Sequence, residues 1–325
     1  MKPLYFVLLW SCTVLISCNG GGKKDKSLLP SSVGNINSLE VIIPNDLWNG
    51  IVGESIREYF AAPTDGLPQD EPLFTINQMQ PESFTGFARN NRLFIYVVIG
   101  EEETAKVASN EYAKPQVGAI IKAPTEEELV KLIKENAPRI IDAFHKSELK
   151  ERQRRTDISL LKTDSLKNVM GVSLKIPSAY RLAKASDSVF WFRKDLKDGT
   201  TNILLYQVPL DFIKGDSTAV GDIIHIRDSI GSKLLPVEDE GLFITEDAYA
   251  PYIFKTTIDG KPAYETKGTW EVKDAYMGGP FLNYAVRDEK NNRYLIMEGF
   301  TYAPAARKRD LQFELESILR TAKFQ

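Results

Sequence analysis

Hydrophobic and polar positions follow three patterns along the chain. Residues 4–16 are almost wholly apolar, and residues 19–38 lack periodicity and are rich in glycine, lysine, serine and asparagine. From residue 39 onward, strand and helix spacings alternate. The pattern predicts a signal peptide, a flexible tether and two structured halves, with the boundaries 1–17, 18–38, 39–155 and 156–325.

The first half is expected to combine short strands with helices. Apolar residues at spacings of three and four, from Trp48 to Phe60, predict a helix that Asp46 caps. A loop rich in proline and glycine follows at residues 61–72. Apolar runs predict strands at residues 39–43, 73–76, 93–99 and 116–122.

The clearest helix begins at Thr125-Glu126-Glu127-Glu128, which has the form of a capping box. Its apolar stripe runs from Leu129 to Phe144 and continues through Pro138, where we expect a kink rather than an end. Residues 146–155 are densely charged. We expect them to form a solvated helix that links the two halves.

The second half is dominated by hairpin signals. Turns at Asp198-Gly199, Asp259-Gly260 and Asn291-Asn292 each separate two apolar runs. Helices are expected near 221–235 and at the C-terminus, where Leu311, Leu315 and Ile318 share a face. The predicted strands are 172–177, 190–193, 201–208, 252–258, 262–272, 281–286 and 293–300.

A short echo between the halves suggests a duplication. Asn90-Asn91-Arg92-Leu93-Phe94-Ile95 resembles Asn291-Asn292-Arg293-Tyr294-Leu295-Ile296, and each segment precedes an amphipathic helix. We therefore predict an α+β fold of two similar halves, each an antiparallel sheet covered by helices. In strand order and in the hairpin at residues 260–264, the second half loosely resembles a Mog1/PsbP-type module. That resemblance transfers no functional residue.

Composition is that of an ordinary globular protein. The 325 residues include 44 acidic and 41 basic side chains, with a net charge of −3, and 43% of the residues are hydrophobic. This length favours two domains. Without a long basic stretch, the chain is not expected to bind nucleic acid.

The first residues resemble a bacterial lipoprotein signal. Lys2 precedes the apolar run, which ends in Leu15-Ile16-Ser17-Cys18. Thirteen residues make about 20 Å of helix, too short for a bilayer core of about 30 Å. The resemblance implies that Cys18 becomes the first residue and carries a diacylglyceryl group and an N-linked acyl chain such as palmitate. Its partner is then the membrane.

The tether lacks the acidic residues that accompany surface export in Bacteroidota-type lipoproteins, since it begins Asn19-Gly20-Gly21-Gly22-Lys23. We therefore expect a periplasm-facing protein on the outer membrane. Cys12 leaves with the signal and Cys18 carries lipid, so the mature chain has no free thiol and no disulfide. Cysteine nucleophiles, zinc ribbons and iron–sulfur clusters are excluded, and no metal or cofactor is expected.

Several segments of the mature chain resemble an uncharacterised Bacteroidota lipoprotein family, domain of unknown function 4837. The resemblance extends from Asn35 to Phe324 and implies no mechanism, because the family has no assigned activity. The segments that carry it are Leu47-Trp48-Asn49-Gly50, residues 62–69, Lys175-Ile176-Pro177-Ser178-Ala179-Tyr180-Arg181, Arg227-Asp228-Ser229-Ile230-Gly231 and Thr266-Lys267-Gly268-Thr269-Trp270.

No catalytic motif stands out. His145 and His225 are expected on the surface, since each points away from the apolar side of its helix. There is no Gly-x-Ser-x-Gly, Walker, His-Glu-x-x-His or dinucleotide motif. A glycosidase needs only two carboxylates, so that class stays open. Asp65, Asp70, Glu71 and residues 238–240 are expected to be solvated loop acids.

Two regions are candidate partner surfaces. The 61–72 loop is long for a compact domain, and such loops often carry function, which draws attention to Pro63, Asp65, Pro68 and Gln69. In the second half, Trp191 and Arg193 alternate with Phe190 and Phe192, so one pair faces a core. The other pair faces either a covering helix or a ligand.

Four Asp-Ser-apolar or Asp-Ser-Thr sequences fit the acceptor used for O-glycosylation of envelope proteins in Bacteroidota. The serines are Ser165, Ser188, Ser217 and Ser229. Turn and capping chemistry also favours Asp-Ser pairs. Ser165 and Ser217 are favoured because they are expected in loops, and Ser229 is the weakest because it is expected in a helix.

These observations favour a lipid-anchored, non-enzymatic envelope protein that binds a protein, glycan or lipid partner. One alternative is a carboxylate-dependent hydrolase of envelope glycans. Another is an accessory subunit of a membrane assembly that docks through the 61–72 loop. A deep cleft with two carboxylates about 5 to 9.5 Å apart would favour the hydrolase.

Overall fold

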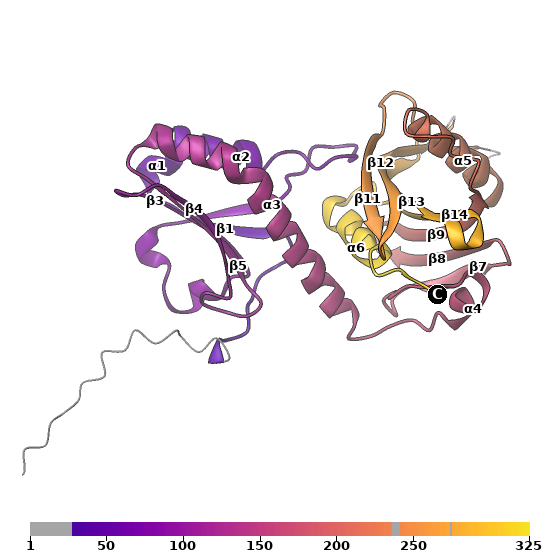
Figure 1. Cartoon of the computed structure of the whole chain (residues 1–325), viewed down its shortest axis with the longest axis horizontal. Coiled ribbons are helices and arrows are strands. Elements are labelled where there is room, and N and C mark those ends of the chain that lie inside the picture. Colours follow the sequence, from indigo (N-terminus) through magenta and orange to yellow (C-terminus); the bar gives the residue numbers. More distant parts are fainter. Residues whose placement is uncertain (1–27, 236–240, 274) are drawn as a thin grey trace, which may run out of the picture.

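The computed structural model describes residues 28–235, 241–273 and 275–325. Two domains with separate hydrophobic cores lie side by side, joined by the long helix α3 (Figure 1). The core of the N-terminal domain uses residues between Leu39 and Phe144, and the largest core of the C-terminal domain uses residues between Leu166 and Ala322. The predicted α+β class is confirmed. The signal peptide and Cys18 lie outside the described residues.

The N-terminal domain is a five-stranded sheet, in the order β2-β1-β3-β5-β4, packed against helices. Its elements are β1 (Ser38–Ile42), α1 (Asn45–Asn49), α2 (Ile51–Phe60), β2 (Thr75–Met79), η2 (Pro81–Ser83), η3 (Gly86–Asn90), β3 (Leu93–Ile99), β4 (Thr104–Ser109), β5 (Val117–Ala123) and α3 (Glu126–Thr156).

The prediction of an antiparallel sheet is wrong for this domain. Strands β1 and β2, β1 and β3, and β3 and β5 pair in parallel, and β4 alone among the described strands of this sheet runs antiparallel to its neighbour. The chain leaves β1 through α1 and α2, which return it to the same end of the sheet, so β2 enters parallel to β1. The two domains are therefore not similar halves.

Helix α3 begins with the predicted capping box, in which Thr125 and Glu128 exchange hydrogen bonds. It continues through Pro138 and changes direction partway, so that its first part lies beside α2 and its second part descends to the C-terminal domain (Figure 1). The charged stretch is not simply solvated. Glu148 is fully buried, and its carboxylate accepts hydrogen bonds from Arg92 at 2.5 and 3.0 Å.

Two smaller predictions in the N-terminal domain are corrected. Asp46 does not cap a helix, because α1 is preceded by Pro44 and α2 starts separately after Gly50. The tether is not free up to residue 38. Ser32 and Val33 donate backbone hydrogen bonds to Lys114 and Asn90, and Asn37 is buried. Backbone hydrogen bonding therefore fixes the chain several residues before the first strand.

The C-terminal domain is built on an antiparallel sheet of the order β10-β12-β13-β14-β9-β8-β7, with β11 beside β12. Its elements are α4 (Asp164–Met170), β6 (Val172–Ser173), β7 (Arg181–Ala185), β8 (Val189–Leu196), β9 (Gly199–Pro209), α5 (Ala219–Leu234), β10 (Phe243–Thr245), β11 (Tyr252–Ile258), β12 (Lys261–Val272), β13 (Gly278–Asp288), η5 (Glu289–Asn291), β14 (Arg293–Tyr302), α6 (Arg309–Leu319) and β15 (Lys323–Phe324).

Helices cover both faces of this sheet. Ile203 and Leu205 of β9 join the core beneath α4 and α6, whereas Leu204 and Tyr206 join the core beneath α5. Because helices cover both faces, β13 and β14 are buried along nearly their whole length. The turn predicted at Asp259-Gly260 is formed with both residues at positive φ, 50° and 75°, as a tight hairpin requires.

None of the described helices is both long and apolar enough to cross a lipid bilayer.

Candidate functional site

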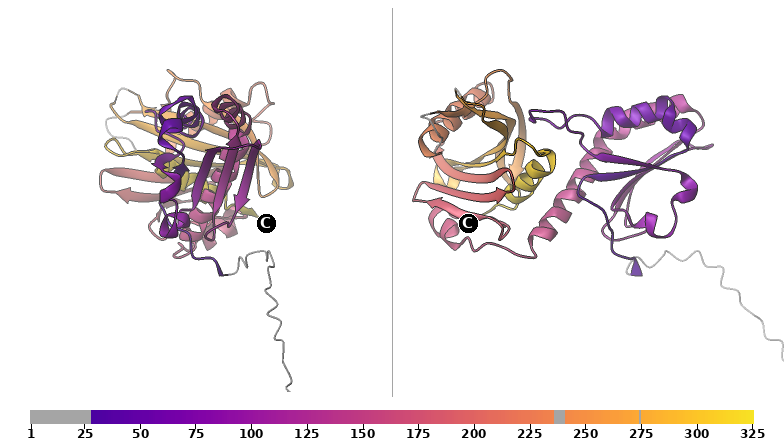
Figure 2. Two further views of the ribbon diagram at one scale, coloured as in Figure 1. Left: turned by 90° about the vertical axis from the view of Figure 1, so that its left-hand side faces the viewer. Right: turned by 180° about the vertical axis from the view of Figure 1, so that it is seen from behind.

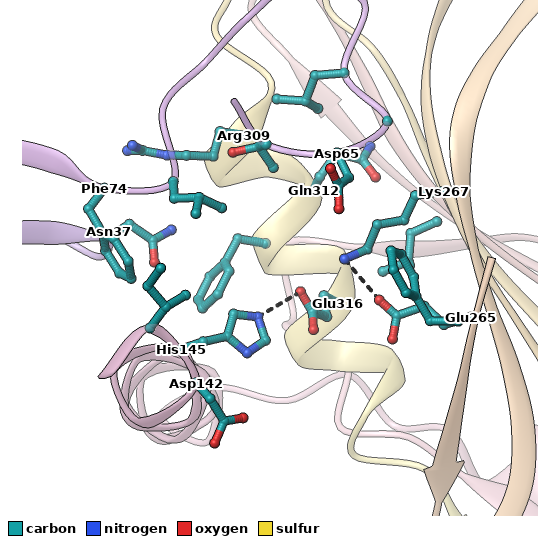
Figure 3. Close-up of a pocket in the computed structure, with 18 of the residues that line it drawn as sticks. Asn37, Asp65, Phe74, Asp142, His145, Glu265, Lys267, Arg309, Gln312 and Glu316 are labelled. Atoms are coloured by element: carbon teal, nitrogen blue, oxygen red, sulfur yellow. Dashed lines mark hydrogen bonds and ion pairs between the residues drawn. The ribbon is translucent and has the colours of Figure 1, made fainter. Parts of the chain in front are cut away.

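A cavity of about 520 Å³, called here the apolar cavity, opens between the two domains (Figure 3). The N-terminal domain contributes α3 and residues 61–74, and the C-terminal domain contributes the sheet and α6. Apolar side chains line it from both domains: Leu67, Leu73, Phe74, Pro138, Ile141, Phe254, Phe281, Leu282 and Phe313. Cavities of this size at domain interfaces commonly hold small molecules.

Residues 61–74, called here the arm, reach from the N-terminal domain to the C-terminal domain, as the right-hand view of Figure 2 shows. Their two limbs are joined by backbone hydrogen bonds of 2.8 Å from Thr64 to Glu71 and 2.9 Å from Leu73 to Ala62. At the tip, Gly66 has φ +77° and lies so close to β12 that a Cβ would be 2.8 Å from the Cβ of Lys267. The tip of the arm can approach β12 this closely because Gly66 has no side chain.

Glu71, expected from the sequence to be a solvated loop acid, is instead buried and holds the arm to α6. Its buried carboxylate accepts hydrogen bonds from the backbone N–H of Lys308 at 2.6 Å and of Arg309 at 3.0 Å. These are donors that the start of a helix leaves unpaired, so a residue of one domain caps a helix of the other. In return, Arg309 donates to the carbonyl of Pro72 at 2.9 Å.

Helix α3 meets α6 on the wall next to the arm. His145 Nε2 lies 3.2 Å from Glu316 Oε2, and its ring contacts Phe313 edge to face at 5.5 Å. About two turns further along α3, Gln153 donates to the carbonyl of Ser317 at 3.0 Å. His145 therefore points away from the core of its own domain, as predicted. It does not simply face water, because it contacts α6 of the other domain. His225 lies exposed on α5.

Four charged groups form a continuous network on the inner wall. Arg320 donates to Glu265 at 2.7 Å and to Glu316 at 2.8 Å, and Lys267 Nζ lies 2.9 Å from Glu265. Burial opposes ionisation of Glu316, but its hydrogen bond to His145 and the charges of His145, Lys267 and Arg320 outweigh it and hold the pKa of Glu316 well below its usual range. The carboxyl group therefore stays ionised.

The same network shifts the pKa of Lys267 in favour of its charged form. Burial favours its neutral form, yet the carboxylates of Glu316 and Glu265 outweigh burial and raise the pKa of Lys267 above its usual value. The wall therefore holds cations and anions that neutralise one another. Across the described residues, no group of three or more His, Cys, Asp or Glu side chains has the arrangement of a metal site.

The structure brings one predicted partner-surface residue to this cavity. Asp65 lines it from the arm, while Pro63, Pro68 and Gln69 are exposed on the same arm. Trp191 lies elsewhere. Its indole N–H donates to Asn202 at 3.0 Å, and its ring packs against the core beneath α5.

Arg193 is also remote from the cavity and pairs with Asp195 at 2.8 Å. Trp191 therefore packs against the core that α5 covers. The arm, proposed from sequence as a docking edge, has its own C-terminal domain as a partner.

The four serines considered for glycosylation are spread over the C-terminal domain. Ser188 and Ser217 lie in exposed turns. Ser165 is exposed but sits in the first turn of α4, so its predicted loop setting is wrong. Ser229 is half-buried in α5, as its sequence indicates.

Sequence reasoning missed Lys267, Glu265 and Glu316. Each sits among alternating or amphipathic positions where a charged residue normally meets water. The one sequence feature that pointed to this site was the unusual length of the 61–72 loop, which indicated that the loop does more than connect two elements.

Comparisons with known proteins agree with this division into two domains. The family model described as Domain of unknown function (DUF4837) matches residues 159–321, about half of the chain. A second model, Domain of unknown function (DUF8532), matches residues 32–157. The family resemblance expected from residue 35 to 324 is therefore confined to the C-terminal domain.

Among solved structures, the Saccharomyces cerevisiae Ran-binding protein Mog1p is similar at 8% identity and a TM-score of 0.32, over 47% of this chain and 90% of that one. No curated protein matches the sequence.

Proposed function

Because the chain belongs to the DUF4837 family, whose description names no activity, we propose a function from the geometry: a lipid-anchored, non-enzymatic protein of the cell envelope whose apolar cavity binds a small, uncharged, largely apolar molecule. The observation that carries the proposal is a cavity of about 520 Å³ lined by apolar side chains from both domains.

The charge of the ligand follows from the pairing on the wall. Glu265, Glu316, Lys267 and His145 already have partners of opposite charge within the protein. A charged ligand would have to break one of these pairs and leave a partly buried charge unpaired, which is costly. An uncharged ligand leaves the network intact and gains from contact with Ile141, Phe74 and Phe313.

The same network argues against the glycan hydrolase. Hydrolysis of a glycosidic bond requires a carboxyl group that holds a proton near neutral pH and releases it to the leaving group. In the apolar cavity, the pKa of Glu316 is shifted in the opposite direction, and Glu265 is held by Arg320 and Lys267. The geometry therefore supports binding better than acid catalysis.

The envelope location rests on the sequence. The lipobox that ends at Cys18 and the absence of acidic residues directly after it, at residues 19–24, support a lipid anchor and an outer membrane position facing the periplasm. Two or more acyl chains, at about 0.8 kcal/mol per buried methylene, hold a protein at a membrane stably.

Ligand binding is tested by filling the cavity. Ile141→Trp adds bulk from α3 without altering a charge, and Val169→Trp adds the same side chain at an exposed position on α4. We expect the soluble mature chain with Cys18→Ala to bind the neutral dye Nile red, at least tenfold more weakly with Ile141→Trp and unchanged with Val169→Trp. Equal affinities for the two variants would contradict the assignment of the cavity.

The anchor is tested by fractionation of the producing bacterium. The natural chain is expected in the membrane fraction after a high-salt wash, and the Cys18→Ala chain in the soluble fraction. A natural chain that a high-salt wash releases from the membrane would overturn lipid anchoring. In a separate measurement, native mass spectrometry of the purified natural chain would identify the molecule held in the apolar cavity.

A further inference from the structure

A second cavity, of about 340 Å³ and called here the arginine cavity, lies at the same domain junction. Four guanidinium groups line it, from Arg152 and Arg155 of α3 and from Arg307 and Arg309 at the start of α6. The lining holds two carboxylates, Glu71 and Asp310. Basic groups thus outnumber acidic ones.

The acidic neighbours do not neutralise this excess, because each of them is shared. Glu314 accepts from both Arg152 and Lys194. Glu151 accepts from both Arg154 and Arg155 at 2.8 Å. Hydrogen bonds from these two arginines hold the pKa of Glu151 at about 2, so its single negative charge serves two cations throughout the physiological range.

Glu71 cannot compensate either, since it accepts the backbone N–H groups of Lys308 and Arg309. Arg309 is paired with Asp310 at 2.9 Å. Two of these arginines still have hydrogen-bond donors without an acceptor. Arg307 is exposed and makes no ion pair or hydrogen bond with the described residues, and Arg152 Nε is buried without an acceptor among them.

We propose that the arginine cavity binds a doubly charged phosphate group, either a free phosphomonoester or the headgroup of a lipid. Guanidinium groups match the oxygens of phosphate in spacing and charge and form short, charge-assisted hydrogen bonds to them. The bound phosphate accepts from Arg307 and draws Arg152 and Arg155 away from their shared carboxylates. This site shares only Arg309 with the apolar cavity and does not depend on the ligand proposed there.

The position of the site suggests how a lipid headgroup would reach it. Asn35 and Ile36, which line the arginine cavity, belong to the last part of the predicted tether, residues 18–38. A lipid-anchored chain would hold this side of the junction within reach of a membrane surface.

The test is calorimetric titration of the full mature chain with Cys18→Ala, using inorganic phosphate at low ionic strength and neutral pH. Arg307→Gln removes a charge that has no partner within the described structure, so the fold stays intact. We expect phosphate to bind at least tenfold more weakly to this variant. Arg181→Gln, at a position 59% exposed on β7, removes the same charge from another part of the domain and should change affinity less than twofold.

A second arm distinguishes the two sources of phosphate. Sedimentation with phosphatidic acid vesicles that depends on Arg307 indicates a lipid headgroup, whereas binding of inorganic phosphate without vesicle binding indicates a free phosphomonoester. No phosphate binding to the parent chain, or an equal loss in Arg307→Gln and Arg181→Gln, overturns the proposal. Arg155→Gln serves as an independent second variant with the same expected loss.

Discussion

The two cavities at the domain junction share α3, the arm and the start of α6 but differ in their electrostatics. Beside the apolar cavity, Lys267, His145 and Arg320 each pair with Glu265 or Glu316. In the arginine cavity, guanidinium groups exceed carboxylates. The first therefore offers contact area to an uncharged molecule, and the second offers unpaired donors to an anion.

Position along two helices decides which cavity a residue serves. On α3, Ile141 and His145 face the apolar cavity, and Arg152 and Arg155, two to three turns later, face the arginine cavity. On α6, Arg309 lines both. A junction between two domains can therefore present two chemically distinct sites without any additional element.

The largest predicted effect comes from removing one carboxylate of the ion-pair network beside the apolar cavity. Glu316→Gln keeps the shape of the side chain but leaves Arg320, His145 and Lys267 with one carboxylate fewer. Removing one partner of a buried ion pair costs about 3 kcal/mol or more. We expect urea unfolding to show a loss of this size, and the variant to acquire phosphate affinity that Arg307→Gln does not abolish.

The control is Glu289→Gln, whose carboxylate is 73% exposed and paired with Arg287. Exposed pairs contribute less than about 1 kcal/mol, so this change should be nearly silent. The pH dependence gives a second check. The folded-state pKa of Glu316 is lowered, so its stabilisation is complete above its ordinary value of 4.5 and is lost as the pH falls below it. The stability gap between natural chain and variant should shrink on acidification, and a gap that is constant with pH would refute this account.

The second-largest predicted effect on stability comes from a substitution at the tip of the arm. Gly66→Ala places a Cβ 2.8 Å from the Cβ of Lys267 and 2.9 Å from the backbone nitrogen of Gly268, so the arm must move away from β12. Gly86→Ala is a matched control, because Gly86 also has positive φ but has nothing within 4 Å of its Cβ. Both variants lose about 1 kcal/mol from the left-handed backbone.

The steric conflict should destabilise Gly66→Ala by about 1 to 3 kcal/mol more than Gly86→Ala. Thermal unfolding measures this difference. Because the arm forms a wall of the apolar cavity and only its base borders the arginine cavity, Nile red binding should weaken while phosphate binding is retained. Equal stability of the two variants would mean that the arm does not press on β12 in solution.

Local features of the fold were predictable from the sequence. The strand Leu93–Ile99 was expected at these residues because its apolar run is continuous, and the capping box of α3 depends on four neighbouring residues. The parallel pairing of β1 with β2 and β3 was not predicted, since it depends on residues far apart in sequence. Local signals thus predicted these elements but not the pairing of the strands.

The site was harder to predict because two domains share it. On α6, Leu315, Ile318 and Leu319 pack on their own sheet, which their spacing predicts. Glu314, Glu316 and Ser317 lie outside this apolar stripe, yet they are buried as well, and each contacts a side chain of α3. A polar helix face that meets water and one that meets another polar domain look alike in sequence.

The smallest predicted effect tests whether the two cavities depend on one fastening point. Glu71→Gln retains one acceptor oxygen, so it keeps one of the two backbone hydrogen bonds at the start of α6 and loses the favourable negative charge. We expect a loss of about 1 kcal/mol, typical of a weakened helix cap. Since Glu71 holds the arm beside the apolar cavity and lines the arginine cavity, Nile red and phosphate titrations should both change by a few fold. A change confined to one of the two titrations would show that the cavities are held open independently.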